Sequence, residues 1–207
     1  MEAAAPPPLE GPSETLADAH EVIDGLFVGS ADAAVEATTG PNSRQIGYIL
    51  DVAGCVTPAI FSALASALAD EALESSEASA VEEQPPPMTR RSWRSQVYLL
   101  NGVETLSVPL DDHGRTQLSE ELQQSWFDFI ESGLARGKVL VHCRLGVNRS
   151  VTVVAAFLVR RRGFAPDEAL ELLSQRRPCA DPVSAYREQL RALQPLSIGR
   201  TGPDGAK

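Results

Sequence analysis

The chain is organised around residues 138–150, which have the sequence KVLVHCRLGVNRS. The first part of this stretch is an apolar run with β-branched residues and predicts a buried strand. The second part contains Gly, Asn and two Arg and is typical of a loop, and residues 150–162 then predict a helix. A strand, a short loop and a helix N-terminus direct backbone N–H groups toward one point, where the helix dipole adds partial positive charge. The stretch therefore predicts a cradle for a phosphate group.

Two side chains of this loop, Cys143 and Arg149, indicate chemistry as well as binding. The thiolate is the nucleophilic form of cysteine, and N–H groups, a helix N-terminus and a guanidinium all favour it over the thiol. Arg149 stands six positions after Cys143, and its planar fork can hold two phosphate oxygens at once. Such a loop can bind a dianion and attack it. The alternative is an inert, buried Cys at a strand end, and this pair of residues alone leaves both interpretations open.

The longer motif resembles the signature His-Cys-x-x-Gly-x-x-Arg-Ser of the dual-specificity, cysteine-based protein phosphatases. The matching positions are His142, Cys143, Gly146, Arg149 and Ser150. The resemblance implies hydrolysis of phosphomonoesters through a phosphocysteine intermediate, with the Ser150 hydroxyl easing departure of the thiolate. It also implies that the phosphate is bound by the whole loop, namely Arg144, Leu145, Gly146, Val147, Asn148 and Arg149.

The match has departures at several positions. Asn148 stands where the family commonly has Ser, and Leu145 where it commonly has Ala. The family's Pro-Asn-x-Gly-Phe before its last helix appears here at 182–186 as PVSAY, and loss of that Asn predicts weaker support of the phosphate loop. His142 precedes the nucleophile on an alternating strand and is expected on the opposite face, as a buried hydrogen-bonding residue.

A general acid is expected from Asp111 or Asp112. A phosphoprotein oxygen leaves poorly as an anion, and a positioned carboxylic acid supplies the proton it needs. Both residues follow a predicted strand, about thirty residues before Cys143, which is where the resembling family keeps its acid. The family's apolar-Pro-x-x-Asp pattern, set beside residues 108–112, selects Asp112. Asp111 stays an alternative, and so does a purely solvated role for both carboxylates.

The order of the remaining elements predicts an α/β fold. Strands and helices are expected at 22–30 (a hairpin turning at Asp24-Gly25), 31–35 (helix), 46–52 (strand), 57–73 (helix), 103–110 (strand), 119–135 (helix capped by Ser119), 166–176 (helix) and from Asp181-Pro182 onward (helix). Strands that alternate with helices indicate a sandwich with a central, mostly parallel sheet of about five strands flanked by helices, which is the cysteine-phosphatase arrangement. Ligands of such sheets bind beyond the carboxyl ends of the strands, where Cys143 is placed.

The composition predicts a single domain with flexible additions. Residues 1–19 are rich in Ala, Pro and Glu and predict a disordered leader, and residues 197–207 predict a disordered tail. The catalytic domain is expected at 20–196, with a flexible surface insertion at about 74–95 that contains three consecutive Pro. Whether Cys55 can trap Cys143 as a reversible disulfide is left open.

Charge and cysteine usage limit the partners. The formal net charge of −10 argues against general binding to nucleic acid or an anionic membrane, because both require a basic surface. No apolar run approaches membrane-spanning length, and no signal sequence opens the chain. The three cysteines form neither a disulfide framework nor a zinc pattern, so no metal or cofactor is expected. The expected location is the cytoplasm, with the nucleus as an alternative, and a monomer is compatible with the sequence.

The expected function is hydrolysis of phosphotyrosine and of phosphoserine or phosphothreonine in a phosphorylated protein partner. Three alternatives are kept. One is a phosphate-binding pseudophosphatase or scaffold, which the presence of Cys143, Arg149 and Asp112 disfavours. Another is a phosphatase of a non-protein phosphate, either an RNA 5′ end or a lipid, which the acidic balance and the single further basic residue Arg144 disfavour. A rhodanese-type loop shares the Cys-to-Arg spacing, but Ser150 and the upstream Asp residues argue against it.

Overall fold

The structure is a computed structural model that describes residues 18–54 and 96–194. The helix expected at 57–73, the insertion at 74–95, Cys55, the tail at 197–207 and most of the leader lie outside the described residues. The first strand begins at Ala19, which is the last residue assigned to the leader.

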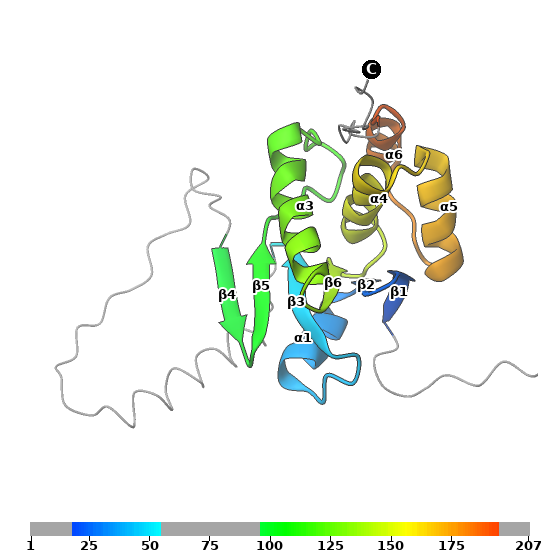
Figure 1. Ribbon diagram of the computed structural model, residues 1–207. Helices are drawn as coiled ribbons and strands as arrows, with labels where there is room; N and C mark the ends of the chain where they lie inside the picture. The colour runs from blue at the N-terminus through cyan, green and yellow to red at the C-terminus, as the bar shows by residue number, and fades with distance from the viewer. Residues whose placement is uncertain (1–17, 55–95, 195–207) are drawn as a thin grey trace, which may run out of the picture.

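The described residues form one six-stranded sheet with the order β1-β2-β6-β3-β5-β4 (Figure 1). The strands are β1 (Ala19–Ile23), β2 (Leu26–Gly29), β3 (Ile46–Asp51), β4 (Gln96–Leu100), β5 (Val103–Ser107) and β6 (Lys138–His142). The four inner strands β2, β6, β3 and β5 run parallel, and β1 and β4 pair antiparallel at the two edges. The predicted α/β class and the mostly parallel sheet are confirmed.

The sheet exceeds the expected five strands because of β4, which was not predicted. β4 and β5 form a hairpin whose turn residues, Asn101 and Gly102, both have positive φ, 48° and 80°. Asn-Gly is the sequence preferred in a two-residue turn of this kind. The signal for β4 was therefore present in the sequence, next to the segment assigned to the insertion.

Helices cover both faces of the sheet, as Figure 1 shows. They are α1 (Ala31–Thr39), α3 (Glu120–Leu134), α4 (Arg149–Arg162), α5 (Pro166–Arg176) and α6 (Ser184–Arg191). α1 packs on one face through its alanines, against Phe27, Ile49 and Leu140. The larger core lies on the other face and includes Val139 and Val141. There α3 and α4 pack on β6, and α5 and α6 pack against α4. The alternation of side chains along β6 thus supplies both cores.

The helix boundaries mostly match their sequence signals. Ser119 caps α3 as predicted, since its hydroxyl accepts a hydrogen bond from the N–H of Leu122, and α5 has the predicted bounds. α1 runs past the predicted end to Thr39 and ends at Gly40, and α6 begins after Pro182, at Ser184. Within 18–54 and 96–194, no helix is both long enough and apolar enough to cross a membrane.

β6 and α4 place the connecting loop at the centre of the molecule. β6 lies between β2 and β3, and its last residue, His142, is in register with Gly29 and Asp51. α4 is buried along its first eleven residues, from Arg149 to Val159, as expected of a helix that is apolar on most sides after its first turn. Because the parallel strands end together, the loop lies beyond their carboxyl ends, as predicted.

Candidate active site

The loop between β6 and α4 requires a glycine at position 146. Gly146 has φ +68°, and a Cβ there would lie 2.5 Å from a guanidinium nitrogen of Arg177 and 2.6 Å from the backbone of Gly29. Both the positive φ and the close approach exclude a side chain. The loop can therefore curl tightly, with the N–H groups of Gly146 and Ser150 hydrogen-bonded to the sulfur of Cys143.

Cys143 lies at the base of an open pocket of about 570 Å³. The residue is only 2 % exposed, and its Sγ is 3.3 Å from Oγ of Ser150. Burial raises the pKa of the thiol, but hydrogen bonds from the hydroxyl and N–H of Ser150 and from the N–H of Gly146, together with the charge of Arg149, outweigh it. The pKa of Cys143 therefore lies below the ordinary value of a cysteine, which favours the thiolate.

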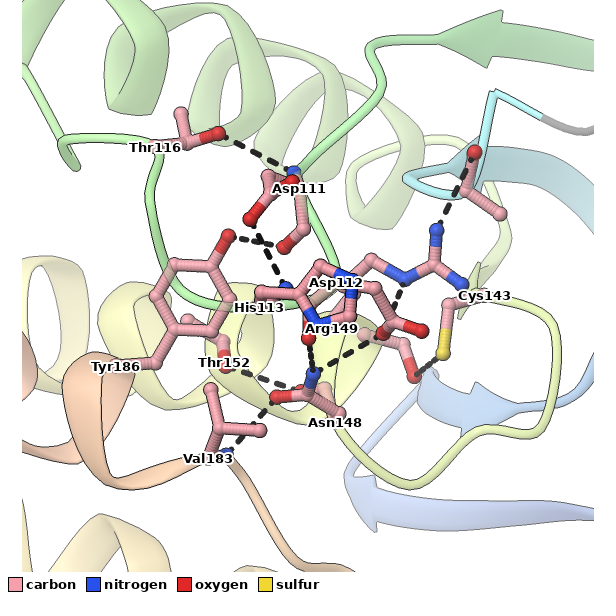
Figure 2. Close-up of polar contacts among 12 residues, drawn as sticks. Asp111, Asp112, His113, Thr116, Cys143, Asn148, Arg149, Thr152, Val183 and Tyr186 are labelled. Carbon is pink, nitrogen blue, oxygen red and sulfur yellow. Dashed lines mark hydrogen bonds and ion pairs between the residues drawn. The ribbon is translucent and has the colours of Figure 1, made fainter.

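Arg149 is the first residue of α4 and lines the same pocket. The residue is 8 % exposed, its Nε lies 2.9 Å from Oδ1 of Asp112, and one terminal nitrogen donates to the carbonyl of Ala53 at 3.4 Å. These contacts orient the guanidinium beside Cys143 (Figure 2). In this orientation the guanidinium can bind an anion in the pocket.

The adjacent carboxylates of Asp111 and Asp112 have different surroundings. The Asp111 carboxylate accepts hydrogen bonds from the side chain and N–H of Arg115 and from the N–H of His113, and these bonds, Arg115 foremost, lower its pKa to about 2. Asp112 instead lines the pocket with Cys143 and Arg149, and its side chain is 56 % exposed. Asp112 is therefore the carboxylate that the loop brings to the pocket.

The buried His142 contacts Asp51, a residue that the sequence analysis did not single out. The ring is 1 % exposed, and its Nδ1 is 3.3 Å from the carbonyl oxygen of Cys143, which can only accept, so Nδ1 carries a hydrogen. Nε2 lies 3.8 Å from Oδ1 of Asp51. Burial lowers the pKa of His142, and Asp51 only partly opposes this. The hydrogen bond from Nδ1 to the Cys143 carbonyl therefore fixes the backbone at the end of β6.

Arg177 is a second residue missed in the sequence. Its side chain is fully buried beneath the loop, where Nε donates to the carbonyl of Gly146 at 2.6 Å and a terminal nitrogen donates to that of Leu145 at 3.0 Å. The guanidinium also forms an ion pair with Asp18. Arg177 thus holds two loop carbonyls on the side away from the pocket, which leaves the N–H groups to line it.

Replacing Arg177 is expected to destabilise the fold. In Arg177→Met the carbonyls of Gly146 and Leu145 lose their buried donor, and the expected loss of unfolding free energy is about 2–4 kcal/mol. Urea unfolding of the purified variant measures this loss. Arg176→Met, at the exposed neighbouring position, is the control and should change the free energy by less than about 0.5 kcal/mol. Equal stability of the two variants would contradict the anchoring role.

The chain is similar in sequence to proteins of one known family. The family model described as "Dual specificity phosphatase, catalytic domain" matches residues 86–195, more than half of the chain. The chain belongs to the dual specificity phosphatase family. It is 38% identical over 89 residues to human dual specificity protein phosphatase 1, a match that covers 41% of this chain and 23% of that protein. The match therefore spans about a quarter of the relative's length.

Solved structures agree with this assignment to the dual specificity phosphatases. A mouse putative dual specificity phosphatase complexed with zinc tungstate is 25% identical, with a TM-score of 0.54, over 92% of this chain and 89% of that chain. PTPMT1 in complex with PI(5)P has a TM-score of 0.53 at 17% identity, over 84% and 92%, and shows the fold alone. The predicted family is confirmed, whereas the roles of the individual site residues stay predictions.

Proposed function

We propose that this dual specificity phosphatase domain hydrolyses phosphotyrosine and phosphoserine or phosphothreonine in proteins through a phosphocysteine intermediate. One observation carries the proposal: Cys143, Arg149 and Asp112 line one pocket. Together they supply a nucleophile, a phosphate ligand and a proton donor.

Binding uses the loop and the guanidinium. The phosphate dianion lies among the N–H groups at the start of α4, where the helix dipole favours negative charge. Arg149 takes phosphate oxygens through its terminal nitrogens and stabilises the charge that spreads over them in the transition state. The buried position of Arg149 strengthens this interaction, because water screens it less.

Hydrolysis then takes two displacements. The Cys143 thiolate attacks phosphorus, the sulfur–phosphorus bond forms and the phosphorus–oxygen ester bond breaks, while Asp112 gives its proton to the departing oxygen. In the second step the Asp112 carboxylate takes a proton from water, and the water oxygen attacks phosphorus. The sulfur–phosphorus bond breaks and releases inorganic phosphate. Ser150, 3.3 Å from the sulfur, donates a hydrogen bond to the returning thiolate.

The rim of the pocket supports a protein substrate. Its charged lining among the described residues consists of Arg144, Arg149, Asp112 and Asp181, so the rim carries little net charge. Leu145, 66 % exposed, adds an apolar edge. A lipid headgroup or an RNA end carries several negative charges and requires a more basic rim, whereas a single phosphorylated side chain does not.

The Asp112→Asn variant tests the proposal. Loss of the proton donor is expected to lower kcat for phenyl phosphate about 10²-fold. Steady-state assays of both proteins at the wild-type pH optimum measure this loss.

Asp111→Asn is the matched control. The amide oxygen of Asn can still accept from the loop N–H groups, so the rate should stay within about threefold of wild type. A large loss in Asp111→Asn together with an unchanged Asp112→Asn would transfer the acid role to Asp111.

A further inference from the structure

The side chain of Asn148 joins three segments of the site (Figure 2). Its Nδ2 donates to the carbonyl oxygen of Asp112 at 2.8 Å and to the carboxylate Oδ1 of Asp112 at 3.1 Å. Its Oδ1 accepts from the N–H of Val183 at 3.0 Å. The partners define the amide orientation, because a carbonyl can only accept and a backbone N–H can only donate.

Asn148 is itself fixed to the start of α4. Its carbonyl accepts from the N–H of Thr152 at 2.9 Å and from the Thr152 hydroxyl at 3.0 Å. On the other side of the loop, the Tyr186 hydroxyl donates to the carbonyl of Asp111. The Asp111-Asp112 segment is therefore held from the starts of two helices, α4 and α6.

Among the described residues, the Asp112 carboxylate has one further polar contact, the ion pair with Arg149 at 2.9 Å. A bound phosphate dianion competes for that guanidinium, which weakens its hold on the carboxylate. The side-chain amide of Asn148 carries no charge, and its N–H group and oxygen are bound to Asp112 and Val183, so a bound anion leaves its two bonds to Asp112 in place. It also donates only to Oδ1, which leaves Oδ2 to carry the acid proton.

Two of the positions that differ from the family pattern, 148 and 183, are in contact with each other. Asn148 replaces the family's common Ser, and Val183 stands where the family pattern has Asn. The side chain of Val183 cannot hydrogen-bond, and its backbone N–H is bound by the amide of Asn148. The amide support thus comes from the phosphate loop and reaches both the acid and the segment before α6.

We propose that Asn148 is a positioning residue that holds Asp112 over Cys143 and orients its proton. The inference rests on the proposed function, because it assumes that Asp112 is the general acid. Loss of Asn148 should therefore slow some substrates more than others, depending on the leaving group. A proton donor matters most when the leaving oxygen is strongly basic and little when the leaving group is a stable anion.

The test compares two substrates in Asn148→Ala and Asn148→Ser. With phenyl phosphate, whose leaving group is poor, kcat/KM should fall about tenfold. With 2,4-dinitrophenyl phosphate, whose leaving group needs no proton, kcat/KM should stay within about twofold of wild type, because this ratio reports only the steps up to phosphorylation of Cys143 and not the later step that needs the base. The inhibition constant of vanadate should also stay within about twofold, since the backbone N–H groups of the loop and Arg149, which bind the anion, are unchanged. A fall of the same size with both substrates would overturn the proposal.

A double-mutant cycle with Asp112→Asn separates this inference from the proposed function. If Asn148 acts through Asp112, Asn148→Ala should add less than about twofold to the phenyl phosphate defect of Asp112→Asn. Additive losses would overturn the positioning role while leaving Asp112 as the acid. If the rate defect of Asp112→Asn is the same for both leaving groups, Asp112 is not the general acid. The proposed role of Asn148 is then wrong as well.

Discussion

The Cys143→Ser variant is expected to lose at least about 10⁴-fold in kcat toward an aryl phosphate. The site lowers the pKa of the Cys143 thiol through Ser150, the loop N–H groups and Arg149, and this favours the thiolate needed for attack. A serine hydroxyl at the same place has a much higher pKa and no adjacent base, so it stays protonated. Steady-state assays over the pH range of wild-type activity measure the loss.

Two controls accompany the cysteine variant. Cys179→Ser changes a cysteine that is exposed and should keep wild-type activity. Cys143→Ser should still bind vanadate or inorganic phosphate, because the loop N–H groups and Arg149 are unchanged. Wild-type turnover by Cys143→Ser would remove the nucleophile from the account.

A second large loss of activity is expected in the variant Arg149→Lys. Lysine keeps the charge but lacks the planar fork, and it also loses the contacts of Arg149 with Asp112 and with the carbonyl of Ala53. We expect kcat/KM to fall about 10³-fold, with most of the loss in kcat, because the fork matters most when charge spreads over the transferred phosphoryl group. Initial rates over a range of aryl phosphate concentrations separate kcat from KM.

Arg162→Lys is the matched control for this variant. Arg162 lies at the opposite end of the same helix, where it is 3.7 Å from Glu131. Its replacement should leave kcat/KM within about twofold of wild type. If Arg149→Lys behaved like Arg162→Lys, the guanidinium would have no special part in catalysis.

The parts of the fold that could be predicted are those coded by local patterns. The apolar run of β6, the Asp24-Gly25 turn, the Ser119 cap and the Pro166 start each depend on a few neighbouring residues. All four are present in the structure. β4 was missed although Asn101-Gly102 is a strong turn signal, because its residues directly follow a segment without periodicity.

The candidate site divides in the same way. Cys143, Arg149 and Ser150 lie within eight consecutive positions, so their spacing alone indicates that they meet. Asn148 was predicted as part of the phosphate-binding loop. The contacts of its side chain with Asp112 and Val183, which are 36 and 35 residues away, were not predicted. Arg177 reaches Gly146 across 31 residues. Such contacts depend on how helices and strands pack, and no local pattern specifies them.

The central claim is that the sulfur of Cys143 carries the phosphoryl group during turnover. Its most direct test uses Asp112→Asn with 2,4-dinitrophenyl phosphate, because this leaving group departs without an acid whereas hydrolysis of the intermediate still needs the base. Acid quenching followed by mass spectrometry should find one phosphate on the peptide that contains Cys143. Phosphate on another residue, or none at any time during turnover, would contradict the account.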